Sequence, residues 1–286
     1  MKIEIQTWKL WMHFAGYFFC FVLAGFIAAI PRFIIGFDNE SGIIILITEI
    51  LRIPIAITLF FYYTIYVSKI PLNRETLICS SFAPLKWGII GFLLPLIVLG
   101  IFYFTGNLTV IETSFQINHK VLVDNILKAL GMSLAAGITE EVLFRGYLVN
   151  LLHKRYSFWL SAIIPSFLFA LVHIGGADSL LNAIQLIVAG MLVSIMFLVI
   201  YKKTGSIWNA SIVHFLWNFL NFNEIIDYGK SNEPAYKMVE LNLGGNDLFN
   251  GGAFGVEASI PAIIVYIAVI FIIWNLKRKQ LQTNEN

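Results

Sequence analysis

Eight long apolar runs limit what this chain can fold into. A helix needs about 20 predominantly apolar residues to cross the hydrocarbon core of a bilayer. Runs near that length cover 12–30, 43–67, 87–104, 122–152, 158–174, 180–201, 206–222 and 259–276. The fourth run is long, and the fifth and seventh are short. The pattern predicts an all-α, polytopic transmembrane bundle of about eight helices, with the lipid bilayer as its partner.

Composition excludes the main alternatives. The 286 residues are 58% hydrophobic and only 13% charged, whereas a soluble domain carries about 25% charged residues. That balance excludes a soluble enzyme and a disordered chain. A net charge of +2 offers no clustered basic face for nucleic acid. The sequence also contains no phosphate-binding loop, so no nucleotide is expected.

No polar stretch of the chain is long enough for a separate soluble domain. We expect a single integral membrane domain over 1–286, with peripheral spans in 1–121 and core spans in 122–222, which contain Glu140, His173 and His214. An outer loop over 223–258 and a last span over 259–276 follow. The outer loop contains GGNDLFNGG, whose glycines and asparagines are typical of turns; a lid over a site is the alternative.

Basic residues predict the orientation, because cytoplasmic loops are enriched in Lys and Arg. With both termini in the cytoplasm, the inner side carries Lys2, Lys9, Lys69, Arg74, Lys86, Lys154, Arg155, Lys202, Lys203, Lys277, Arg278 and Lys279. The outer side carries Arg32, Lys120, Lys230 and Lys237. Acidic residues reverse this bias and lie outside: Asp38, Glu40, Glu112, Asp178, Glu224, Asp227, Glu233, Glu240, Asp247 and Glu257. Both termini are therefore expected to be cytoplasmic.

Ionisable groups inside spans are costly, so each is a candidate functional residue. Glu49 and Arg52 lie three apart and can neutralise each other, and Lys128 can extend toward the boundary. The remaining residues of this kind are Glu140, Glu141, Arg145, His173 and His214.

Two adjacent glutamates stand in GITEEVLFRGYL. Glu141 and Arg145 are four residues apart in the favourable order, so we expect an ion pair. Glu140 points about 100° away from Glu141 and has no counter-ion on its own helix. Such a carboxylate suits a general base, which must take up and return a proton.

Two further helices carry histidines. Phe169 and His173 share one helix face in SFLFALVH, and His214 and Asn218 share another in HFLWN. Counted from the cytoplasmic charges, Glu140, His173 and His214 lie at depths of roughly 15–22 Å. We therefore expect all of these groups around one buried cavity, approached from the cytoplasmic side.

The set favours hydrolysis of an amide by activated water. Glu140 would deprotonate the water, His173 would orient it, and Asn218, with or without His214, would donate to the oxyanion. An alternative stays open, in which His173, His214 and Glu140 ligate Zn²⁺ and the bound water attacks.

Three motifs carry a family resemblance. E-E-x-x-x-R (Glu140, Glu141, Arg145), F-x-x-x-H (Phe169, His173) and H-x-x-x-N (His214, Asn218) resemble, in this order, the motifs of the CPBP intramembrane proteases. This family, also called Abi, includes the type II CAAX prenyl endopeptidases of the Ras-converting-enzyme kind. The resemblance covers about 123–222.

That resemblance implies a peptidase. It makes Glu140 the catalytic glutamate, with His173 and His214 completing the water site and Asn218 supporting the oxyanion. Glu141 and Arg145 would support them, and the family implies either metal-dependent or metal-free chemistry. The expected substrate is a hydrophobic or lipidated peptide in a bacterial cell membrane. The alternative functions are bacteriocin immunity and membrane scaffolding or transport without proteolysis.

Overall fold

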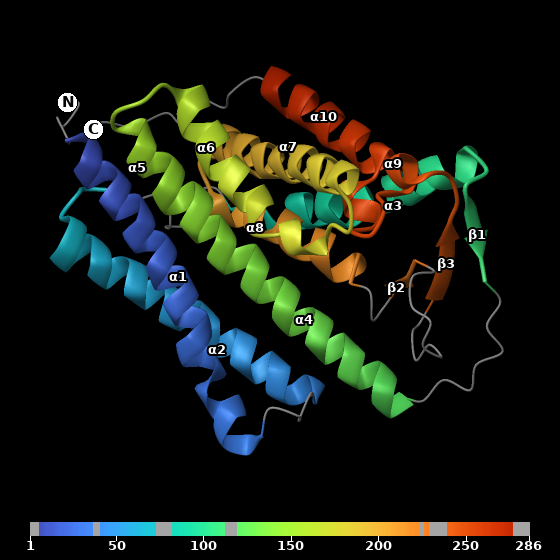
Figure 1. Ribbon diagram of the computed structural model, residues 1–286, viewed down its shortest axis with the longest axis horizontal. Helices are drawn as coiled ribbons and strands as arrows, with labels where there is room; N and C mark the ends of the chain where they lie inside the picture. The colour runs from blue at the N-terminus through green and yellow to red at the C-terminus, as the bar shows by residue number, and fades with distance from the viewer. Residues whose placement is uncertain are drawn as a thin grey trace.

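The computed structural model describes residues 6–36, 41–72, 82–111, 119–222, 226–228 and 239–276, and its described part is an α-helical bundle (Figure 1). Each of the eight predicted spans coincides with one helical segment. These segments are α1 (Thr7–Ile35), α2 (Gly42–Tyr62) with the π-helix η1 (Tyr63–Ser68), α3 (Pro84–Phe104), α4 (His119–Glu141) with the π-helix η3 (Val142–Leu148) and α5 (Val149–His153), α6 (Phe158–Leu171), α7 (Leu180–Thr204), α8 (Ile207–Leu220) and α10 (Ile260–Asn275).

The helical segments fall into two groups by length. By length and composition, five segments of the described part can cross a membrane: Thr7–Ile34, Gly42–Ser68, Pro84–Phe104, His119–His153 and Leu180–Thr204. In contrast, α6 and α8 have 14 residues each and α10, the predicted last span, has 16. These lengths correspond to roughly 21–24 Å of helix against a hydrocarbon core of about 30 Å. The prediction that the fifth and seventh segments are short is confirmed.

Serine side chains and one glycine define several helix ends. Ser157, Ser179 and Ser259 precede α6, α7 and α10, and each accepts a hydrogen bond from a backbone N–H of the first turn. Such caps satisfy donors that have no partner within the helix. Helix α7 ends at Gly205, whose φ of 71° is the left-handed conformation that glycine adopts without strain.

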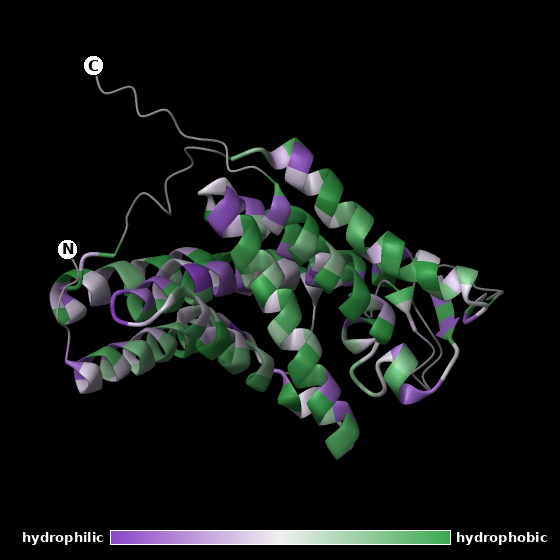
Figure 2. Cartoon of the chain, turned by 90° about the horizontal axis from the view of Figure 1, so that it is seen from above, coloured by the Kyte–Doolittle hydropathy of each residue, from purple (hydrophilic) through white to green (hydrophobic). Residues whose placement is uncertain are grey.

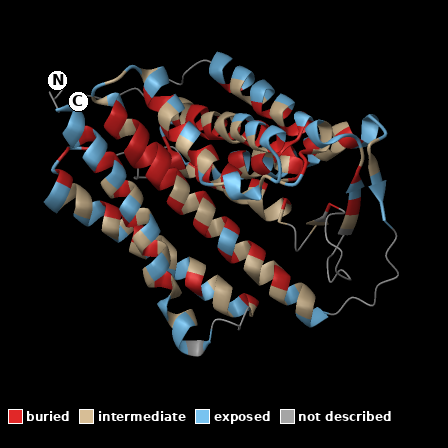
Figure 3. Ribbon diagram, in the orientation of Figure 1, coloured by how far each residue is buried: buried red, intermediate tan, exposed pale blue. Residues whose placement is uncertain are grey.

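Helix α4 runs through the middle of the bundle, with α2 packed on one side of it and α8 on the other (Figure 1). Helix α8 also packs against α3, and α7 packs against α6 and α10. Buried residues concentrate where α4 continues into η3 and α5 (Figure 3). Hydrophobic residues make up most of the helices (Figure 2), and many of their large apolar side chains are exposed, as expected in lipid.

Small residues allow the close approach of α4 to its neighbours. A Cβ atom on Gly131 would lie 2.8 Å from Cα of Leu46 in α2, and one on Gly137 would lie 2.9 Å from the backbone nitrogen of Phe215 in α8. Both obstacles are backbone atoms, which cannot rotate away. Such small-residue contacts are typical of membrane helix pairs.

Three short strands at one end of the bundle were not predicted. They are β1 (Leu108–Val110), β2 (Ile226–Asp227) and β3 (Val239–Leu243), in the order β1-β3-β2. Strand β1 pairs antiparallel with β3, with Leu108 opposite Leu243. The sheet ties the loop after α3 to the loop before α10, where α9 (Asp247–Asn250) and η5 (Val256–Ala258) follow.

Replacement of Gly137 by alanine should force α4 and α8 apart. Overpacking of this kind costs about 1–3 kcal/mol, so we expect the thermal unfolding temperature in detergent to fall. Gly100→Ala on α3 is the matched control, because a Cβ there meets nothing within 4 Å. Equal unfolding temperatures of the two variants would contradict the close packing of α4 against α8.

Candidate functional site

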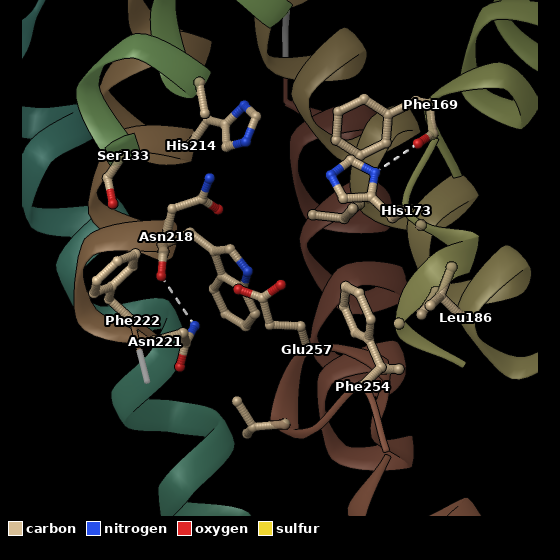
Figure 4. A pocket seen from close by; sticks show the side chains of 18 of the residues that line it. Ser133, Phe169, His173, Leu186, His214, Asn218, Asn221, Phe222, Phe254 and Glu257 are labelled. Carbon is tan, nitrogen blue, oxygen red and sulfur yellow. Dashed lines mark hydrogen bonds between the residues drawn. The ribbon is translucent and has the colours of Figure 1, made fainter. Parts of the chain in front are cut away.

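A cavity of about 520 Å³ lies between α4, α6, α7 and α8. Ser133 of α4, Leu186 of α7 and the two motif histidines line it (Figure 4). Most of its other walls are apolar or aromatic side chains. A cavity of this size, with few polar groups among apolar walls, is a typical small-molecule or peptide site.

The cavity lies toward the sheet end of the bundle. Gly176, which follows α6, Tyr228, which follows α8, and the stretch 253–258 before α10 all contribute to its wall. The basic residues Lys154 and Lys202 lie at the opposite helix ends. The lining therefore does not favour the expected approach from the side with the basic loops, and residues of the outer loop cover the site instead.

His214 lies between the two glutamates of the first motif. Its Nδ1 is 2.9 Å from Oε1 of Glu141, and its Nε2 is 4.0 Å from Oε2 of Glu140. The imidazole is 2% exposed and stacks on Phe197, with ring centroids 4.6 Å apart. A hydrogen bond from Nδ1–H to a carboxylate fixes the ring orientation and leaves Nε2 free to act on the other side.

The predicted Glu141–Arg145 pair is present, but it belongs to a larger network. Nη1 of Arg145 is 2.9 Å from Oε1 of Glu141. Nη2 donates to the backbone oxygen of Ser194 at 2.8 Å and to its Oγ at 3.0 Å, and Ser194 in turn donates to Ser166. Arg145 and Glu141 are 1% and 0% exposed. The network connects α4, η3, α6, α7 and α8.

The first motif lies where α4 changes into the π-helix η3. Glu141 is the last residue of α4, and Arg145 is in the middle of η3. All seven residues of η3 are buried. Short π-helical insertions are frequent at functional sites, because they change the direction of side chains along a helix.

His173 follows the end of α6 rather than standing within it. The helix ends at Leu171, and Nδ1 of His173 donates to the backbone oxygen of Phe169 at 2.8 Å (Figure 4). Since that carbonyl can only accept, Nε2 is the acceptor nitrogen of the neutral ring. The ring of Phe169 lies 5.0 Å from that of His173 and 6.1 Å from that of His214, so this aromatic side chain separates and positions both histidines.

Glu140 and Asn218 are the other two predicted site residues, and of these Asn218 lines the cavity whereas Glu140 is not among the lining residues. The side chain of Glu140 is 16% exposed, and its Oε2 lies 4.0 Å from Nε2 of His214. The carboxylate, which has no counter-ion on its own helix, thus has an imidazole of another helix nearby. Asn218 lies one turn beyond His214 on α8 and lines the cavity (Figure 4). The sequence prediction missed the contact between Glu141 and His214, because helix spacing reveals only contacts within one helix.

Glu257 is a site residue that the sequence analysis assigned only to the outer loop. It lies in η5, lines the cavity and points into it between α8 and Phe254 (Figure 4). Burial raises the pKa of its carboxyl group, while nearby His173 and His214 act to lower it, as does a hydrogen bond from Trp217. One signal could have revealed it: its neighbours Phe254, Val256 and Ala258 are apolar, unlike those of a solvated loop acid.

The donor set does not fit the possible zinc site of His173, His214 and Glu140. Among the residues that the structure describes, no three His, Cys, Asp or Glu side chains are arranged to hold a metal ion. The Nδ1 hydrogen bonds of His214 and His173 leave only Nε2 of each ring available to a metal. We therefore derive no step through a metal.

Fold and site together define a polytopic membrane protein with carboxylate and imidazole groups around a buried cavity. Residues 122–220 match the family model described as "Type II CAAX prenyl endopeptidase Rce1-like". The match confirms, over this segment, the resemblance to the Rce1-like, or CPBP/Abi, family that the three motifs carry. The match supports, in general, the assignment of this segment to a CAAX-type intramembrane protease.

A curated relative matches a smaller part of the chain. An "Uncharacterized 24.3 kDa protein" of Escherichia coli is 36% identical over 78 residues, which are 27% of this chain and 36% of the relative. The match thus spans about a third of that protein's length.

Removal of Arg145 alone should destabilise the protein strongly. Arg145→Met leaves the buried carboxylate of Glu141 without its counter-ion, and breaking one partner of a buried pair costs about 3–5 kcal/mol. Adding Glu141→Gln removes the stranded charge, so the double variant should recover part of the loss. Thermal unfolding in detergent measures both effects, and a single variant as stable as the unaltered chain would contradict the network.

Proposed function

We propose that the chain is an intramembrane endopeptidase in which Glu140 takes a proton from water beside His173 and His214. One observation carries the proposal: the carboxylate of Glu140 lies 4.0 Å from Nε2 of His214, an imidazole whose other nitrogen is already bonded to Glu141. This distance is too long for a direct hydrogen bond, and a water molecule can contact both groups.

Glu140 suits the base better than Glu141 does. Oε1 of Glu141 already faces both Arg145 and His214, and that residue is fully buried. Glu140 has the freer carboxylate, with 16% of its side chain exposed. Glu141 is then a positioning residue, which holds His214 in one orientation in the way that the carboxylate of a catalytic triad holds its histidine.

The remaining groups have complementary roles. With its Nδ1 proton on the carbonyl of Phe169, His173 presents Nε2 as an acceptor that can orient the water. A proton moves from the water to Glu140, and the water oxygen adds to the peptide carbonyl carbon. The amide of Asn218, next to the cavity, donates to the oxyanion that forms. When the C–N bond breaks, the amine leaves with the proton returned by Glu140.

The cavity lining supports a hydrophobic or lipid-bearing peptide as the substrate. Its walls carry aromatic and aliphatic side chains, among them Phe222, Phe254, Leu186 and Val193.

Because the described basic residues Lys9, Lys69, Lys154 and Lys202 gather at one end, we retain the proposal that both termini are cytoplasmic. The covering loop then lies on the opposite face of the membrane.

Glu140→Gln should abolish peptide cleavage by the detergent-purified protein without changing its thermal unfolding. Loss of a general base lowers the rate by about 10²–10⁴-fold, while glutamine preserves the shape. Glu240→Gln removes a carboxylate of β3, outside the three motifs, and serves as the matched control. Full activity of the Glu140 variant would refute the assignment and favour a scaffold, transport or immunity protein.

Peptide cleavage should also survive exhaustive chelation. In the proposed mechanism Glu140 and the two histidines activate water without a metal ion. Among the described residues, no three His, Cys, Asp or Glu side chains are arranged to hold one. Treatment with 1,10-phenanthroline, followed by elemental analysis and an activity assay, tests this point. Activity that is lost with zinc and restored by zinc would show that the metal-dependent mechanism is the correct one.

A further inference from the structure

The described wall of the cavity contains a carboxylate but no lysine or arginine. The carboxylate is that of Glu257. Arg145 is the guanidinium on the adjoining helix, but it is 1% exposed and its donors are directed at Glu141 and Ser194. The electrostatic complement of this wall is a positively charged group of a ligand.

The backbone around Glu257 is held in place by several hydrogen bonds. Tyr266 of α10 donates through its hydroxyl to the backbone oxygen of Glu257 at 3.0 Å. The side-chain amide of Gln185 on α7 donates to the backbone oxygen of Ala258 at 2.7 Å. Ser259 donates to the backbone oxygen of Val256 at 2.6 Å. The carboxylate therefore projects from a fixed position rather than from a freely moving loop.

Aromatic side chains surround this carboxylate. Trp217 and Tyr266 contact each other edge to face, with ring centroids 5.4 Å apart, and both line the cavity together with Tyr228 and Phe254. Phe254 in turn lies edge-on to His173, at 6.4 Å between ring centroids. Aromatic faces attract ammonium groups, most strongly where water is excluded.

We propose that Glu257 and the aromatic side chains around it form a subsite for an ammonium group of the substrate, either a lysine side chain or a free peptide N-terminus. The subsite rests on the proposed function, since it selects which peptide enters the same cavity. It lies next to the proposed water site, because Glu257 lines the same cavity as His173 and His214 (Figure 4). An ammonium group there would supply the permanent positive charge that no lysine or arginine of the cavity wall provides. Glu257 is thereby a specificity residue, separate from the groups that activate water.

Matched peptides test the subsite. We would scan lysine and its neutral isostere norleucine through the positions that flank the cleaved bond, and compare free with acetylated N-termini to distinguish the two sources of the ammonium group. At one position the unaltered protein should prefer the charged peptide by roughly tenfold in kcat/KM. Glu257→Gln should abolish that preference, Glu257→Asp should keep part of it, and Glu240→Gln should keep it fully.

Binding provides a measurement that does not depend on cleavage. n-Octylammonium should raise the thermal unfolding temperature of the unaltered protein more than that of Glu257→Gln, whereas 1-octanol should affect both equally.

The two assays separate failure of the subsite from failure of the peptidase. Equal cleavage of charged and neutral peptides by the unaltered protein, or an unchanged preference in Glu257→Gln, would overturn the subsite and leave the peptidase intact. Stabilisation by octylammonium that requires Glu257, in a protein that cleaves no peptide, would support the subsite and refute the proposed function. Equal stabilisation of both proteins by octylammonium would overturn the subsite.

Discussion

The buried contacts among Arg145, Glu141 and His214 are the interaction on which the rest of the site depends. Moving a carboxylate and a guanidinium out of water costs several kcal/mol for each ion unless they meet in good geometry. Here Oε1 of Glu141 lies 2.9 Å from both the guanidinium and the imidazole. The serines of α6 and α7 satisfy the far side of Arg145. Separation of these helices would strand a charge, so the network fixes their arrangement as well as the orientation of His214.

The sequence predicted those features that depend on local patterns. Apolar runs gave each described long helix, and i,i+4 spacing gave the Glu141–Arg145 pair, because both properties repeat along a single helix. Ionisable residues in apolar runs pointed to His173 and His214, which the structure brings to one cavity with Phe169 between them. The roles assigned to Glu140 and Asn218 stay predictions.

The features that the sequence did not reveal depend on segments far apart in the chain. Glu141 and His214 are 73 residues apart, and spacing within one helix contains no information about such a contact. Strand β1 is too short to be distinguished from a loop, and its partner β3 comes more than a hundred residues later. Glu257 lies in a segment rich in glycine, and its place in the cavity follows from the hydrogen bonds that tie η5 to α7 and α10.

The two 14-residue helices have a consequence for the surrounding lipid. Helices α6 and α8 are shorter than the hydrocarbon core, and a short span is accommodated by local thinning of the bilayer at a cost of fractions of a kcal/mol per Å of mismatch. Acyl chains next to these helices would then be compressed, and headgroup water would come closer to the site than in an undisturbed leaflet. The acyl-chain length of the surrounding membrane would thus affect the proposed peptidase, because longer acyl chains oppose the hydration that hydrolysis needs.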